Sequence, residues 1–105
     1  GVRYVVMESA GDAKQMMAML GELTRDASTP TLAVLGSREG GGTLVVASTE
    51  ASIAAERHNA VEILNAIAGH IGGGGGGRPT IAQGGGSNPD GIPAALDEAR
   101  SLLGI

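Results

Sequence analysis

The sequence predicts a single α/β domain in which about three helices pack against a small mixed sheet. Its length of 105 residues is typical of one domain. Short runs of β-branched and apolar residues alternate with segments whose apolar residues recur at helical spacing. Two of these runs, 31–36 and 43–48, are joined by a glycine-rich turn, which predicts an antiparallel hairpin. The expected order of elements is β-α-β-β-α-(Gly loop)-β-α.

The first half of the chain predicts three strands and one helix. Residues 4–7 are apolar and β-branched, and are expected to form a short buried strand. Capping patterns then open a helix that is expected to run from about Asp12 to Asp26. Both strands of the hairpin are nearly continuously apolar, which predicts that both faces of the sheet are covered. Residues 50–57 fit either a short helix or a loop, and the sequence leaves that choice open.

The second half predicts two helices with a short strand between them. Asn59 followed by Glu62 is a capping pattern that opens a helix, and Gly72 is placed to end it. The short strand is expected within residues 78–83. A last helix follows and is expected to end at Gly104.

Composition excludes several classes of protein. The chain has no cysteine, so it holds neither a disulfide framework nor a thiolate zinc site. Its apolar runs fall short of the ~20 residues that cross a bilayer, so no membrane partner is expected. A net charge of −4 disfavours non-specific binding to nucleic acid but leaves open a small site read through backbone groups. The chain does not begin with methionine, so we expect it to be a fragment of a longer protein.

No arrangement of side chains predicts catalysis or metal binding. His58 and His70 are the only histidines, and they lie ~18 Å apart at opposite ends of one predicted helix, so they cannot share a metal there. Asp97 and Glu98 are adjacent, point ~100° apart on a helix, and are expected to be solvated. The sequence therefore predicts no catalytic residue and no metal ligand.

Six consecutive glycines, residues 72–77, are followed by Arg78 and Pro79 and by a second glycine run, 84–86. A flexible linker is one interpretation, but the strand and helix that follow are too small to stand alone. A second interpretation is close packing against another element, because glycine permits close backbone approach. A third is a nest of amides that binds an anionic or carbonyl oxygen, with Arg78 and Gln83 adding hydrogen-bonding groups. The last two interpretations are compatible. A dinucleotide-binding loop is excluded, because the run follows a helix and precedes a proline.

The string from Ile71 to Gly86 resembles the signature GGxGGGRPxxAQxGG near the end of alanyl-tRNA synthetases. Residues 59–63 resemble the helix start N-A-x-E-(I/L) that precedes this signature in the family. The resemblance covers residues 59–105 well, and only the order of elements before that. It implies the carboxy-terminal domain of these enzymes, which is related to the DHH-associated domain of certain phosphoesterases. The phosphoesterase pattern carries a histidine where Arg78 and Pro79 stand, which favours the synthetase.

The resemblance implies a domain that catalyses nothing by itself. Residues 1–105 are expected to form a single C-terminal domain of an alanine–tRNA ligase, which binds the elbow of tRNA-Ala and supports aminoacylation and editing. No cofactor is expected in the domain, since ATP and zinc would belong to other domains of the parent enzyme, and the location is expected to be cytoplasmic. The expected RNA-binding residues are Gly73, Gly74, Gly75, Gly76, Gly77, Arg78, Gln83, Gly84 and Gly85.

Two alternative functions stay open. In the first, the same fold is mainly a dimerisation or interdomain element, which needs a contiguous apolar patch. In the second, it is the nucleic-acid-binding domain of a DHH-family phosphoesterase. The expected partners are tRNA-Ala and the other domains of the parent synthetase, with a second copy of the chain as the partner in the dimerisation alternative.

Overall fold

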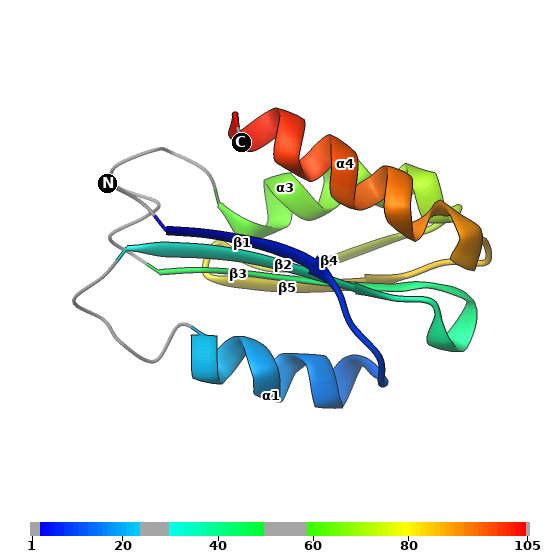
Figure 1. Ribbon diagram of the computed structural model, residues 1–105, viewed down its shortest axis with the longest axis horizontal. Helices are drawn as coiled ribbons and strands as arrows, with labels where there is room; N and C mark the ends of the chain where they lie inside the picture. Colours follow the sequence, from blue (N-terminus) through cyan, green and yellow to red (C-terminus); the bar gives the residue numbers. More distant parts are fainter. Residues whose placement is uncertain (1–2, 24–29, 50–58, 105) are drawn as a thin grey trace.

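The computed structural model describes residues 3–23, 30–49 and 59–104, which form one five-stranded sheet with helices on both faces. Helix α1 lies on one face, and α3 and α4 lie on the other (Figure 1). The α/β fold class predicted from the sequence is confirmed. In chain order the elements are β1 (Arg3–Glu8), α1 (Ala13–Leu23), β2 (Thr31–Ser37), the 3₁₀ turn η1 (Glu39–Gly41), β3 (Thr43–Ser48), α3 (Ala60–Ile67), η2 (Ala68–Ile71), β4 (Gly74–Arg78), β5 (Ile81–Gly85), η3 (Pro89–Gly91) and α4 (Ile92–Leu103).

The sheet is mixed, as predicted, with the strand order β1-β2-β3-β5-β4. β1 is parallel to β2, and every other pair of neighbours is antiparallel. β2 and β3 form the predicted hairpin around η1. Two elements differ from the sequence prediction. β1, predicted to be buried, is an edge strand with no fully buried residue, and the glycine run forms strand β4 instead of a loop. β4 pairs with β5 through the turn at Pro79 and Thr80, and the pair forms one edge of the sheet.

The two central strands, β2 and β3, are buried on both faces, as their continuous apolarity predicts. Alternate residues of a strand point to opposite faces, so each strand supplies two cores. The face toward α3 and α4 buries Leu32, Val34, Leu44 and Val46. The face toward α1 buries Ala33, Leu35, Val45 and Ala47 with Met16 and Leu20 of the helix. The stability of the domain therefore comes from the middle of the sheet.

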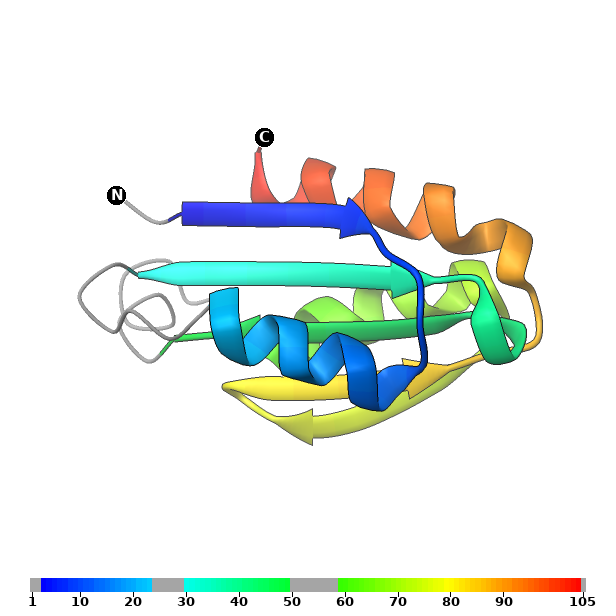
Figure 2. The ribbon, with the colours of Figure 1, turned by 60° about the horizontal axis from the view of Figure 1, so that its bottom comes forward.

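Helix α1 is narrower than the sheet that it covers. It packs on β2 and β3, whereas α3 on the opposite face also contacts β4 and β5. Figure 2 looks onto the α1 face: the first turn of α1 overlaps β5 in this view, and β4 lies outside the area that the helix covers. Gln83 pairs with Val45 and with Gly76, and cross-strand partners share a face of the sheet. Gln83 and Gly76 therefore lie on the same face of the sheet as α1, beyond the area that the helix covers.

Local signals at the helix ends act as predicted. Oδ1 of Asn59 accepts a hydrogen bond from the N–H of Glu62 at 2.9 Å and caps α3. Gly72 ends the helical segment with φ 67°, and Gly104 ends α4 with φ 74°. Both are left-handed conformations that glycine adopts without a Cβ penalty.

Three features of the sequence analysis lie outside the described residues: the end of the first helix near Asp26, the undecided segment 50–57, and His58. Within the described ranges, no helix combines the length and apolarity that crossing a membrane requires.

The return of the chain from β5 to α4 depends on Gly91. A Cβ on Gly91 would lie 1.8 Å from the carbonyl oxygen of His70, whereas a Cβ on Gly69 would meet nothing within 4 Å. The φ of Gly91, −80°, is open to any residue, so the obstacle is steric. We expect Gly91→Ala to lower the free energy of unfolding by roughly 1–3 kcal/mol. Gly69→Ala should change it by less than about 0.5 kcal/mol. Urea unfolding measures both, and equal stabilities of the two variants would contradict this packing.

Candidate nucleic-acid interface

The residues singled out in the glycine-rich sequence lie on a hairpin at one edge of the sheet. β4 and β5 pair from Gly74 opposite Gly85 to Arg78 opposite Ile81. Every residue of β4 is exposed. We call residues 74–85 the glycine hairpin. It brings all the expected RNA-binding residues onto one structural unit, except Gly73, which directly precedes it.

The glycines of the run fall into two alternating sets. A Cβ on Gly73, Gly75 or Gly77 would lie 2.0–2.3 Å from a carbonyl oxygen of β5, closer than real Cβ atoms approach. A Cβ on Gly74 or Gly76 would meet nothing within 4 Å. At the first set, glycine is required because the backbones of β4 and β5 approach closely. At the second set, the absence of side chains leaves the backbone of β4 exposed. The linker interpretation is wrong, because the run is a paired strand, and the close-packing interpretation is confirmed for the first set.

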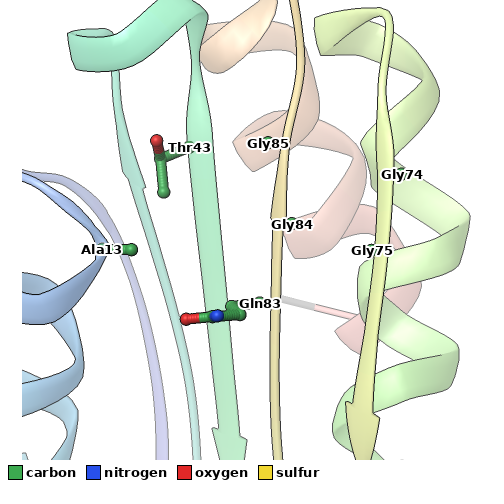
Figure 3. Close-up of a pocket in the computed structure, with 7 residues that line it drawn as sticks. All are labelled: Ala13, Thr43, Gly74, Gly75, Gln83, Gly84 and Gly85. Atoms are coloured by element: carbon green, nitrogen blue, oxygen red, sulfur yellow. The ribbon is translucent and has the colours of Figure 1, made fainter.

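A pocket of about 380 Å³ lies between the glycine hairpin and the first turn of α1. It is lined by Ala13, Thr43, Gly74, Gly75, Gln83, Gly84 and Gly85. The glycines contribute only backbone, so Thr43 and Gln83 are its polar side chains. Figure 3 shows both side chains on the side of the sheet where Ala13 lies. Sequence reasoning missed Thr43, because only the register of β3 with β5 places it opposite Gly85.

The two polar side chains of the pocket retain hydrogen-bonding capacity. Oγ1 of Thr43 donates to the carbonyl oxygen of Glu39 at 3.2 Å, which leaves the lone pairs of the hydroxyl oxygen as acceptors. The side chain of Gln83 is exposed and has no hydrogen-bond partner among the described residues. The pocket therefore offers an amide donor, an amide acceptor and a hydroxyl acceptor to a ligand.

The end of α1 beside the pocket is already capped. Oδ1 of Asp12 accepts a hydrogen bond from the N–H of Gln15, and Oε1 of Gln15 accepts one from the N–H of Asp12, both at 2.9 Å. The Asp12 carboxylate thus occupies the position at the helix N-terminus that the helix dipole makes favourable for an anion. A phosphate gains nothing from this helix, so any attraction for phosphate has to come from another group.

Arg78 is the group best placed for that attraction. It is exposed at the end of β4 and makes no hydrogen bond or ion pair with any described residue. By contrast, Nε of Arg38 lies 3.1 Å from a carboxylate oxygen of Glu8. A guanidinium without an internal partner keeps all five donors for a ligand.

The remaining charged groups hold elements together. Nε2 of His70 in η2 lies 2.5 Å from Oε1 of Glu98 in α4. Arg100 contacts Asp97 at 2.8 Å and donates to the carbonyl oxygen of Val6 at 3.3 Å. The expectation that both carboxylates are solvated holds for Asp97, whose side chain is 77% exposed. It is wrong for Glu98, whose partner His70 lies 28 residues away in the sequence. In the part of the chain that the structure describes, no three His, Asp or Glu side chains are grouped so as to hold a metal ion.

Comparison with known sequences points to one family. A model of the DHHA1 domain matches residues 1–104. The alanine–tRNA ligase of Chloroflexus aurantiacus is 34% identical over 103 residues, which cover 98% of this chain and 12% of that protein. The alanine–tRNA ligase of Methanothrix thermoacetophila is 46% identical over 69 residues, which cover 66% of this chain and 8% of that protein. The chain thus spans a small part of the length of these relatives.

Comparison with solved structures agrees. The crystal structure of the C-Ala domain from the alanyl-tRNA synthetase of Aquifex aeolicus matches with a TM-score of 0.77 and 27% identity, covering 97% of this chain and 89% of that one. The resemblance seen in the glycine signature is therefore confirmed over nearly the whole chain. With a family model that matches residues 1–104, the chain belongs to the DHHA1 domain family.

Proposed function

We propose that this chain is the C-terminal domain of an alanine–tRNA ligase and that its glycine hairpin binds the elbow of tRNA-Ala. The observation that carries the proposal is an exposed edge strand without side chains that ends in Arg78, an arginine with no partner among the described residues. The similarity to alanine–tRNA ligases and to a C-Ala domain supports the parent enzyme. The domain itself carries out no chemistry.

A bare glycine strand suits the surface of a folded RNA. An edge strand leaves a row of backbone N–H and C=O groups unpaired. Such groups hydrogen-bond to phosphate oxygens and to the 2′-hydroxyls that distinguish RNA. Because Gly74 and Gly76 have no Cβ, the ribose–phosphate backbone approaches this strand more closely than it would approach any other residue. Recognition is then by shape and backbone.

Charge limits the strength of this contact. The net charge of −4 repels RNA at long range, so the isolated domain binds weakly and through few phosphate contacts. Arg78 supplies a planar fork that matches a phosphate. In the parent enzyme the other domains supply most of the affinity, and they also hold ATP and zinc. By binding the elbow, this domain holds one tRNA on the enzyme during both aminoacylation and editing. These reactions take place in the cytoplasm.

The sheet area that α1 leaves uncovered also favours a second function, as an interdomain or dimerisation element. The two functions differ in their dependence on charge, because a contact with RNA through Arg78 weakens with salt and an apolar protein contact does not. A phosphoesterase parent gains no support from the relatives described above, which are alanine–tRNA ligases.

The role of Arg78 is tested by Arg78→Gln, with binding of a tRNA-Ala transcript measured by fluorescence anisotropy over a series of salt concentrations. We expect about tenfold weaker binding and a slope of log K against log salt that is smaller by about 1. Arg38→Gln is the matched control, since it removes the same charge from an arginine that is paired with Glu8. If the two variants behave alike, Arg78 does not contact a phosphate.

The bare face of β4 is tested by Gly74→Leu. The new side chain has open space around it, and leucine suits a strand better than glycine, so the free energy of unfolding should be unchanged or higher. Binding of tRNA-Ala should weaken roughly tenfold, because the side chain holds the RNA away from the strand.

Gly21→Leu is the control for Gly74→Leu, because it adds the same side chain to the exposed side of α1, where a Cβ also meets nothing within 4 Å. It should leave binding unchanged. A stable Gly74→Leu variant that binds tRNA-Ala normally would remove the glycine hairpin from the interface.

A further inference from the structure

We infer that the pocket between α1 and the glycine hairpin is a nucleobase subsite, in which Gln83 and Thr43 read the hydrogen-bonding edge of one exposed base. The inference rests on the proposed function and assigns different parts of the RNA to different residues. Arg78 binds a phosphate, and the pocket binds a base.

The pocket differs from two others in carrying a side-chain amide without a partner among the described residues. A second pocket, of about 310 Å³, is lined by apolar side chains, among them Met17, Leu20 and Ile81, and by hydroxyl side chains, and it contains no amide. A third, of about 300 Å³, is lined by charged groups that are already engaged. There, Glu8 is paired with Arg38, and the Glu39 carboxylate accepts a hydrogen bond from the backbone of Gly11. Of these three pockets in the described part of the chain, the one at the glycine hairpin combines an unpaired amide, Gln83, with a floor of backbone.

The shape of the pocket suits a flat ring. Four glycines of the paired strands β4 and β5, Gly74, Gly75, Gly84 and Gly85, line it without side chains, so this part of its floor is backbone. A volume of about 380 Å³ is at the small end of ligand pockets and is large enough for a base. A ring that lies flat on this floor directs its edge toward the side chains of Gln83 and Thr43, which stand on the same side of the sheet.

The chemistry of the pocket favours a base over a phosphate. None of its lining residues is charged, and the adjacent helix terminus already carries the Asp12 carboxylate. An uncharged donor and acceptor on one side chain is the arrangement that pairs with a base edge, as glutamine does with the amino group and ring nitrogen of adenine. The lone pairs of the Thr43 hydroxyl add an acceptor for an amino group.

The spacing of Gln83 and Arg78 allows one nucleotide, or two neighbours, to contact both. Gly76 pairs with Gln83, and Arg78 lies two residues further along the same strand. At 3.3 Å per residue this is about 7 Å along β4. A base and its phosphate are separated by one sugar, so a ribose lying over Gly76 connects the two contacts without a side chain in its way.

The test compares Gln83→Met with Arg78→Gln in binding of the tRNA-Ala transcript at several salt concentrations. Methionine keeps the length of glutamine and removes its donor and acceptor, and the exposed position tolerates it. We expect Gln83→Met to weaken binding about tenfold while leaving the slope against log salt unchanged. Arg78→Gln should lower that slope. Thr43→Val, which removes the hydroxyl, should weaken binding less than Gln83→Met.

A second measurement distinguishes a base from a sugar phosphate. The chain is titrated by NMR with the four nucleosides and with ribose 5-phosphate, which has no base. We expect at least one nucleoside to shift the side-chain amide of Gln83 and the backbone amides of Gly84 and Gly85, with no such shifts in Gln83→Met or with ribose 5-phosphate.

The outcomes distinguish a failure of the base subsite from a failure of the proposed function. If Gln83→Met binds tRNA-Ala like the unmodified chain while Arg78→Gln binds weakly, the base subsite is overturned and the proposed function stands. If neither variant changes binding, both fail. If ribose 5-phosphate produces the shifts at Gln83, or no nucleoside does, the pocket is not a site for a base.

Discussion

The close contact between the backbones of β4 and β5 is the constraint on which the candidate site depends. Side chains at Gly73, Gly75 and Gly77 would collide with carbonyl oxygens of β5, so this strand pairs as it does only because those positions are glycine. Glycine is otherwise a poor strand residue, because its backbone loses the most freedom on folding. The strand is held by β5 on one side and by α3 packed against it. Steric necessity at alternate positions thus fixes the strand, and the intervening Gly74 and Gly76 supply its bare surface.

Different strands of the sheet carry the hydrophobic core and the proposed binding surface. Its central strands carry apolar side chains on both faces and bury them under α1 on one side and under α3 and α4 on the other. The outer pair, β4 and β5, is covered on one face by α3 and η2, and its second face is partly open beside α1. Changes on that open face alter what the domain contacts and cost little folding free energy. A binding surface on a rigid sheet also loses little conformational entropy when it meets a ligand.

Local chemistry was readable from the sequence, and non-local pairing was not. Asn59 and Gly72 predict the start and the end of a helical segment, because capping depends on residues a few positions apart. The glycine run was predicted to be a loop because strand propensity is low for glycine, and tertiary pairing with β5 overrides that preference. Thr43 enters the pocket only through the order of the strands, which no local pattern encodes. The contact of Glu98 with His70 depends likewise on how two helical segments pack.

The distribution of charge is compatible with the proposed contact between this acidic chain and RNA. Arg38 and Arg100 are paired with carboxylates at the surface, while the exposed side chain of Arg78 has no partner among the described residues. The guanidinium of Arg78 by itself gives little long-range attraction, so the proposed binding does not rely on this domain for the first encounter with RNA. Tethering supplies what charge does not, because a site linked to other RNA-binding domains meets its target at a high effective concentration. When the domain is tethered in this way, weak contacts that depend on the shape of the RNA add specificity without slowing the release of the RNA. A bare strand, one arginine and one uncharged pocket are sufficient for that role.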